Sequence, residues 1–145
     1  MSTVETATGD SRPRTGDTAS IITLDSARLA PPAGHYSHIA VHRGVAYISD
    51  QLPVTPDGSC LADEPFETQV QQVLRNLDAC LATVDTSRER LISVTVHVTD
   101  IGDWPAFDRL YQDWLGANRP ARAVAGAHEL HYGSAVEVHA IAALD

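Results

Sequence analysis

An arginine and a glutamate near the end of the chain are the side chains best suited to chemistry. Arg122 follows Pro120 closely at the start of an apolar stretch, and Glu137 lies between two valines in Ala-Val-Glu-Val-His. Arginine stays cationic and holds carboxylates with a planar, two-pronged fork, whereas glutamate can orient a water molecule and take its proton. Each residue also has an ordinary interpretation. Arg122 could be a rim arginine paired with a surface acid, and Glu137 could belong to a solvated outer face of a strand.

Four further polar or aromatic residues are weaker candidates. His139 lies two residues after Glu137 and therefore shares its face of a strand. Ser49 and Asp50 end an apolar stretch at a point where the backbone could contact a ligand. Tyr36 lies in a Gly-His-Tyr-Ser loop and could be either core filler or the wall of a substrate pocket.

Missing residue types and spacings exclude several classes of chemistry. All ten basic residues are arginines, so a lysine Schiff base, a pyridoxal-phosphate anchor and a P-loop lysine are excluded. His128 and His131 are three residues apart in a predicted turn, unlike the helical His-Glu-x-x-His of zinc proteases. We therefore expect neither a metal nor a cofactor.

The charge and the cysteines indicate where the protein works and what it does not bind. The 145 residues carry a net charge of −9, which disfavours binding to nucleic acid. No apolar run reaches the ~18–20 residues of a membrane span, and the N-terminus resembles no export signal. We expect a cytoplasmic protein in which Cys60 and Cys80 are reduced, with Cys80 in the core of a helix.

The chain divides into a tail and one α+β domain. Residues 1–18 are predicted to be a disordered tail and residues 19–145 a single domain. Apolar residues at steps of three and four predict helices over 65–85 and 103–116. Strands are expected at 20–24, 38–42, 45–49, 91–98, 122–127 and 134–143, with a tight turn at Arg43-Gly44. This order predicts two helices on one face of a mostly antiparallel or mixed six-stranded sheet.

Six stretches, in this order and spacing, resemble the Rid/YjgF family of reactive intermediate (enamine/imine) deaminases. The resemblance covers nearly all of the predicted domain, and the pairing of Pro-Ala-Arg with Val-Glu-Val is its most specific part. The stretches are Ala30-Pro-Pro-Ala-Gly-His-Tyr-Ser37, Val45-Ala-Tyr-Ile-Ser-Asp-Gln-Leu-Pro53, Val73-Leu-Arg-Asn-Leu77, Val94-Thr-Val-His-Val-Thr-Asp100, Arg119-Pro-Ala-Arg122 and Val136-Glu-Val-His-Ala-Ile-Ala142.

The resemblance implies a fold, an assembly and a site. The fold would be of the chorismate-mutase-like type, in a homotrimer with clefts between subunits. Arg122 would bind the substrate carboxylate and Glu137 would position the hydrolytic water, while Tyr36 and Ser49 would line the pocket. The reaction would hydrolyse the C=N bond of a small imine or enamine that carries a carboxylate, without a cofactor.

Three residues depart from the family pattern at the implied pocket. Asp50 replaces a usual glycine, Asp108 an asparagine that is often present, and Val124 a cysteine found in many members. An aspartate close to a ligand carboxylate costs on the order of 1 kcal/mol or more.

These departures keep two alternatives to the usual reaction open. One is an accessory enzyme of a specialised biosynthetic pathway that acts on a larger imine or enamine, with Asp50 and Asp108 serving an amine-bearing substrate. The other is a non-catalytic trimer that binds a small ligand. A ribonuclease activity, described for some members, does not suit the net charge of −9.

Overall fold

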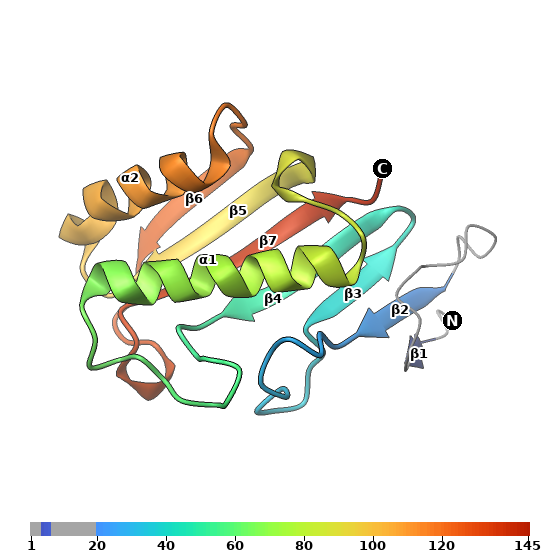
Figure 1. Ribbon diagram of the computed structural model, residues 1–145, viewed down its shortest axis with the longest axis horizontal. Coiled ribbons are helices and arrows are strands. Elements are labelled where there is room, and N and C mark those ends of the chain that lie inside the picture. The colour runs from blue at the N-terminus through green and yellow to red at the C-terminus, as the bar shows by residue number, and fades with distance from the viewer. Residues whose placement is uncertain (1–3, 7–19) are drawn as a thin grey trace.

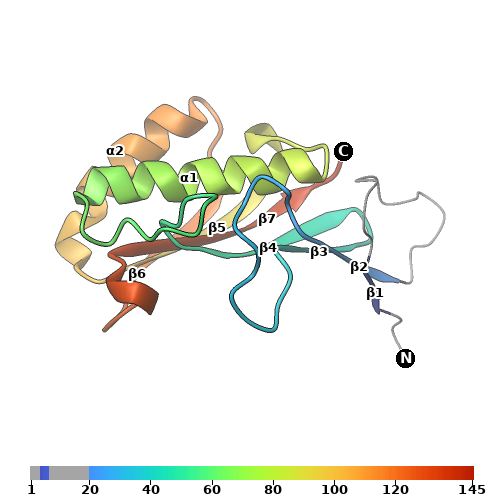
Figure 2. The same cartoon turned by 60° about the horizontal axis from the view of Figure 1, so that its bottom comes forward.

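A mixed β-sheet with two helices on one side forms the protein (Figures 1 and 2). The computed structural model describes residues 4–6 and 20–145. The strands are β1 (Val4–Thr6), β2 (Ile21–Leu24), β3 (Ile39–His42), β4 (Val45–Gln51), β5 (Leu91–Val98), β6 (Ala121–Gly126) and β7 (Val136–Ala143). The helices are α1 (Phe66–Thr83) and α2 (Trp104–Leu115), with short 3₁₀ turns η1 (Arg88–Arg90), η2 (Ile101–Asp103) and η3 (His131–Gly133). The predicted α+β class and the position of both helices are confirmed.

The sheet order puts the last strand in the middle of the sheet. The order is β1-β2-β3-β4-β7-β5-β6, with β1–β2 and β5–β6 parallel and the other neighbours antiparallel. β6 runs parallel to β5 because α2 forms the crossover between them. β7 therefore lies between β4 and β5, while β6 forms an edge of the sheet (Figure 1).

The predicted tight turn joins β3 to β4. Arg43 and Gly44 both have positive φ, 49° and 74°, which is the backbone of the two-residue turns that match the twist of a hairpin. The hairpin pairs Ile39 with Ile48 and His42 with Val45. This register directs Ile39 and Ile48 to the helix-covered face, where both are buried.

The core lies between the sheet and the two helices. Cys80 on α1 and Phe107 on α2 are fully buried, together with alternate residues of β5 and β7. The complete burial of Cys80 confirms its predicted role as a small core residue, and this burial raises the pKa of its thiol to about 12. Cys60 and Cys80 are both free. Within the part of the chain that the structure describes, no helix is both long and apolar enough to cross a bilayer.

The N-terminal region corrects one expectation in part. Val4–Thr6 forms β1, parallel to β2, so these residues are not part of a disordered tail and the sheet has one strand more than predicted. β2 would otherwise be an edge with unpaired backbone groups, and a Val-Glu-Thr segment has the β-branched residues that strands favour. The remainder of the predicted tail, residues 1–3 and 7–18, lies outside the described residues.

Candidate functional site

The two residues expected to do the chemistry lie on opposite faces of the sheet. In the parallel pairing of β5 with β6, Arg122 is level with Val94, which is fully buried beneath the helices. Glu137 pairs with His97, three residues further along β5. Because strand residues alternate between faces, Arg122 belongs to the helix-covered face and Glu137 to the open face. One chain therefore does not bring them together.

The first group of side chains, the arginine cluster, consists of Asp108, Tyr111 and Arg122. Arg122 Nη1 donates a hydrogen bond to Asp108 Oδ1 at 2.6 Å, and its guanidinium carbon lies 5.0 Å from the centre of the Tyr111 ring. The cluster lines a cavity of about 510 Å³ together with Arg119 and Pro120. Arg122 is thus paired with a surface acid, as its ordinary interpretation proposed. A guanidinium has five N–H donors, so this single bond does not use up its capacity.

Tyr111 contributes an uncommitted donor to the arginine cluster. Among buried side-chain nitrogen and oxygen atoms of the described residues, Tyr111 Oη is the one without a hydrogen-bond partner. Burial raises the pKa of Tyr111 to about 12, so the phenol keeps its proton at neutral pH. A buried polar group without a partner is costly, and a ligand in the lined cavity could supply that partner.

The second group, the histidine cluster, consists of Asp50, His97, Glu137 and His139 on the open face. His97 Nδ1 donates to Glu137 Oε1 at 3.2 Å, and His139 Nδ1 donates to Asp50 Oδ1 at 2.6 Å. The two imidazole rings meet edge to face, with centres 6.2 Å apart. The Glu137 side chain is only 14% exposed, so its interpretation as a solvated outer residue is wrong.

A bulge in β4 brings Asp50 to this cluster. Between Ile48 and Gln51, β4 has one residue more than the matching stretch of β7, from Ala140 to Val138. A bulge of this kind places two residues opposite one. It lets Asp50 reach His139 from a strand whose regular alternation would turn it to the other face.

Glu137 is a stronger base than an ordinary glutamate. Burial is the main cause that raises its pKa, and the negative charge of Asp50 raises it further. His97 opposes both effects through its charge and its hydrogen bond. A partly buried carboxylate with a raised pKa is suited to accept a proton from water.

Three members of the histidine cluster also have the composition of a metal site. Asp50, His97 and Glu137 each offer a ligand atom, and these atoms all lie within 4.8 Å of one another. Imidazole and carboxylate ligands suit divalent transition metals. Within residues 4–6 and 20–145, this set of three could hold such an ion, and the sequence did not predict it.

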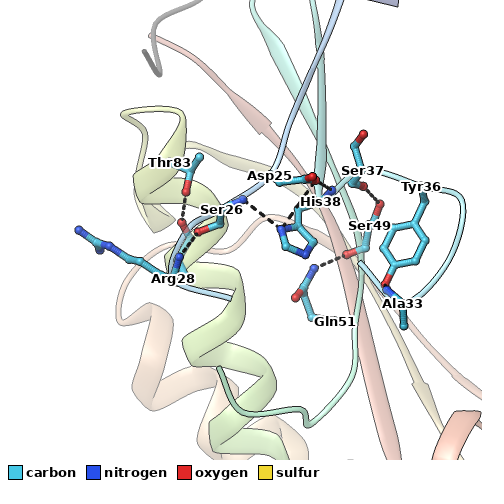
Figure 3. Close-up of polar contacts among 11 residues, drawn as sticks. Asp25, Ser26, Arg28, Ala33, Tyr36, Ser37, His38, Ser49, Gln51 and Thr83 are labelled. Carbon is cyan, nitrogen blue, oxygen red and sulfur yellow. Dashed lines mark hydrogen bonds and ion pairs between the residues drawn. The ribbon is translucent and has the colours of Figure 1, made fainter. Parts of the chain in front are cut away.

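Tyr36 and Ser49 lie side by side at the edge of the open face (Figure 3). Ser49 Oγ donates to the backbone oxygen of Ser37 at 2.7 Å, and Tyr36 Oη accepts a bond from Ala33 N at 3.4 Å. Tyr36 is 50% exposed, so it is not core filler.

The loop that carries Tyr36 is fixed by a buried histidine. His38 is 5% exposed, and its Nδ1 accepts a hydrogen bond from Ser26 N at 3.0 Å. Its own backbone N–H donates to Asp25 Oδ1 at 3.0 Å, so both ends of the loop are held together (Figure 3). The histidine therefore has a structural role, with Nδ1 as a hydrogen-bond acceptor.

A cavity of about 770 Å³ joins these residues to the histidine cluster. It is lined by Tyr36, Ser49, Asp50, Glu137 and His139, and by the Glu129–Tyr132 segment before β7. A second cavity of about 260 Å³ adjoins it, since Tyr36, Asp50 and Tyr132 line both. Its other walls are mainly apolar, among them Leu29, Pro31 and Val54.

Two residues depart from the site expected from the sequence: Val124 was expected in it and lies elsewhere, and His97 was not expected and belongs to it. Val124 follows Arg122 on the same face, packs against the core and lines none of these cavities, so its contact with substrate stays a prediction. His97 was missed although the sequence held a signal. Ser93, Thr95 and His97 alternate with buried valines, which marks a polar face on β5.

The sheet order and the two helices on one face define a Rid-type fold, and comparison with known proteins supports this class. The model of the endoribonuclease L-PSP family matches residues 27–144, and the chain belongs to that family. A RutC family protein of Aquifex aeolicus is 33% identical over 113 residues, covering 77% of this chain and 90% of the relative. Protein HMF1 of Saccharomyces cerevisiae is 30% identical over 111 residues, covering 77% and 85%.

Solved structures agree with this assignment. The Rid family protein YyfA of Yersinia pestis is 28% identical, with a TM-score of 0.82 over 86% of this chain and 99% of its own. RidA of the Antarctic bacterium Psychrobacter sp. PAMC 21119 is 26% identical, with a TM-score of 0.79 over 83% and 98%. The resemblance to the Rid/YjgF family and the predicted fold are therefore confirmed.

Proposed function

We propose that this protein hydrolyses the C=N bond of small, carboxylate-bearing imines and enamines, at sites completed between the subunits of a homotrimer. The observation that carries the proposal is the separation of the two clusters within one chain. The arginine cluster can hold a carboxylate but contains no suitable base, and the histidine cluster contains a base but no arginine. Each has one half of the required chemistry.

The surfaces around the two clusters support a site between subunits. Tyr47 points to the open face and is 48% exposed, and Ile92 on β5 is 46% exposed. β6 is an edge strand that carries Arg122, and its alanines are exposed. Apolar surface and an open strand edge are features that subunit contacts cover. In the proposed trimer, Arg122 of the partner subunit faces the Glu137 cavity of the first.

The reaction follows from the chemistry of the two halves. Arg122 binds the substrate carboxylate with the nitrogens that Asp108 does not use, and Tyr111 Oη donates a further hydrogen bond. This fixes the imine carbon in place. Glu137 orients a water molecule and takes its proton as the water oxygen attacks that carbon. Ammonia then leaves and a carbonyl group forms.

The experiment generates 2-aminoacrylate in situ and follows the loss of its imine with and without the protein. Arg122→Ala should remove the acceleration while fold and assembly remain intact. Arg109→Ala is the matched control, because Arg109 is an exposed arginine on α2 that lines neither cavity of the site. Full activity in Arg122→Ala would contradict the assigned role of this arginine.

A larger substrate is the second candidate, and the apolar cavity next to the Glu137 cavity favours it. An apolar arm of the substrate could enter this space of about 260 Å³ while the C=N bond lies beside Glu137. Asp50 borders both spaces and could pair with an amine. Imines derived from 2-keto acids with long apolar side chains should then show higher kcat/KM than 2-aminoacrylate.

Ligand-induced stabilisation of the protein without any turnover would instead indicate a non-catalytic binding protein.

The name of the endoribonuclease L-PSP family refers to ribonuclease activity, which the charge of this chain opposes. A net charge of −9 repels a phosphate backbone, and binding to nucleic acid depends on neutralising several phosphates. The histidine cluster itself contributes two carboxylates to the open face. We therefore assign the site to small molecules.

A further inference from the structure

The histidine cluster contains more acid–base groups than the activation of water requires. Glu137 with its partner His97 suffices to orient a water and accept a proton. Asp50 and His139 form a second hydrogen-bonded pair in the same cavity. Hydrolysis of a C=N bond also needs an acid, because nitrogen leaves as ammonia only after it has gained protons.

We propose that His139, held by Asp50, is a catalytic acid that protonates the substrate nitrogen while Glu137 deprotonates the attacking water. This inference rests on the proposed imine hydrolysis and adds to it a residue, and a reason for the aspartate at position 50. It assigns the two carboxylate–histidine pairs different tasks.

The positions of the two groups suit an acid and a base that act on one bond. Glu137 and His139 are two residues apart on β7, so their side chains leave the same face of the strand about 6–7 Å apart. Both line the cavity of about 770 Å³, and this separation leaves room for a water molecule and a C=N group. Asp50 takes the hydrogen bond of Nδ1, so His139 acts as an acid in its imidazolium form, with Nε2–H as the proton that it gives to the substrate.

The proton transfers balance over one turnover. The water oxygen bonds to the imine carbon, one water proton passes to Glu137, and the imine nitrogen takes a proton from His139. The resulting carbinolamine then loses its hydroxyl proton to His139, while the nitrogen takes the proton held by Glu137. The C–N bond breaks as ammonia leaves and the carbonyl forms, and both side chains return to their starting states.

The titratable groups around His139 come from five parts of the chain. Asp50 on β4 bonds to it, and His97 on β5 contacts its ring. Glu137 on β7 and the Glu129–Tyr132 segment, which includes His131, line the same cavity, as does Tyr36. A pH profile of the wild-type enzyme reflects all of these groups together. The test therefore compares variants in which one group is changed.

The test measures kcat and KM across pH for His139→Asn, with His128→Asn as the matched control. Asparagine keeps an amide donor near Asp50 but cannot supply the acid. We expect kcat to fall by roughly 10²–10⁴-fold, with KM changed by no more than a few-fold. His128 is exposed and lines none of these cavities, so its variant should match the wild type.

Two further measurements distinguish a catalytic role from a structural one. In His139→Ala, added imidazole should restore part of kcat, since the side chain is 40% exposed and its space is accessible. Asp50→Asn should lower kcat less than His139→Asn, because the imidazole remains but loses its charged partner. A His139→Asn variant with wild-type kcat, or a His139→Ala variant whose lost activity imidazole does not restore, would overturn the proposal.

Three other results would show which part of the proposal is wrong. Loss of activity on chelation and recovery with Zn²⁺ would show that Asp50, His97 and Glu137 hold a metal, and would overturn the acid role. Absence of turnover by the wild type would overturn the proposed function and remove the reaction that His139 serves. Turnover by the wild type with an unaffected His139→Asn would overturn the acid alone.

Discussion

The arginine cluster and the histidine cluster differ in what they contain and in how the fold holds them. The arginine cluster pairs one cation with one carboxylate beside an aromatic ring, at the edge strand β6 and the helix α2. The histidine cluster combines two carboxylates with two imidazoles on β4, β5 and the central strand β7. The first is suited to bind an anion and the second to move protons. The comparison teaches that the fold keeps the anion-binding groups and the proton-transfer groups of one chain on opposite faces of the sheet.

The sheet topology is the physical cause of this division. The crossover through α2 makes β6 parallel to β5 and places Arg122 beneath the helices, whereas β7 returns antiparallel between β4 and β5. Side chains on opposite faces of one sheet cannot act on one small molecule. The proposed site therefore depends on a second subunit, and the following variants test this division.

The largest expected effect is the loss of catalysis in Glu137→Gln. We expect kcat to fall by roughly 10²–10⁴-fold, because the amide cannot take a proton from water. Burial and Asp50 raise the pKa of Glu137 in the folded state, so its ionised form opposes folding as pH rises through that pKa. The melting temperature at neutral pH should therefore equal or exceed that of the wild type. A clear fall in melting temperature together with normal kcat would reverse the roles assigned to the cluster.

The next effect concerns the support of the arginine cluster by α2. Asp78 on α1 accepts hydrogen bonds from Trp114 Nε1 at 3.0 Å and from Arg88 Nε at 2.9 Å. Asp78→Ala should cost about 1–2 kcal/mol in the free energy of unfolding, since these partly exposed groups lose charge-assisted bonds. It should also raise KM more than it lowers kcat, because α2 carries Asp108 and Tyr111.

Denaturant unfolding and steady-state kinetics check this prediction. Asp113→Ala is the control, since Asp113 is an exposed aspartate of α2. If Asp78→Ala lowered kcat and left KM unchanged, α2 would support catalysis rather than substrate binding. That result would contradict the separate roles of the two clusters.

The pH dependence of kcat/KM should respond differently to substitution of Asp50 and of Asp108. Because Glu137 must be ionised to act as a base, kcat/KM should fall as pH decreases through its raised pKa. Asp50→Asn removes a charge that raises this pKa, so the acid limb should move to lower pH. Asp108→Asn changes the other cluster and should leave the limb in place. Equal shifts in both variants would contradict the separation of the clusters.

The smallest effect is a gain in affinity in Asp108→Asn. Asp108 competes with a substrate carboxylate for Arg122 through a pair whose side chains are 24% and 41% exposed. Exposed pairs contribute less than about 1 kcal/mol, so KM for a carboxylate-bearing substrate should fall by no more than about five-fold. An amine-bearing substrate should show the opposite change. An increase in KM for the carboxylate would show that Asp108 positions Arg122 rather than competing for it.

The sequence predicted the elements better than the relations between them. The periodicity of α1 and the alternation of β5 depend on local burial, so both elements are where they were predicted. Arg122 and Glu137 were also singled out from their apolar neighbours. Their opposite faces depend on the sheet order and on the crossover through α2, and no local pattern specifies either.

The histidine cluster shows the same limit at the level of single residues. His139 was placed on the face of Glu137 by simple alternation, but its contact with Asp50 needs the bulge in β4. His97 meets Glu137 only because β7 pairs with β5, 40 residues away in the chain. Pairing between distant strands is a tertiary property.

The most direct test of a site completed between subunits mixes two inactive variants. Arg122→Ala and Glu137→Gln are unfolded together, refolded as a mixture and assayed for hydrolysis of 2-aminoacrylate. In a trimer with random mixing, about a quarter of the interfaces combine an intact Arg122 with an intact Glu137, so about a quarter of wild-type activity should return. Activity no higher than that of either variant alone, in a mixture shown to contain mixed trimers, would contradict a site shared between subunits.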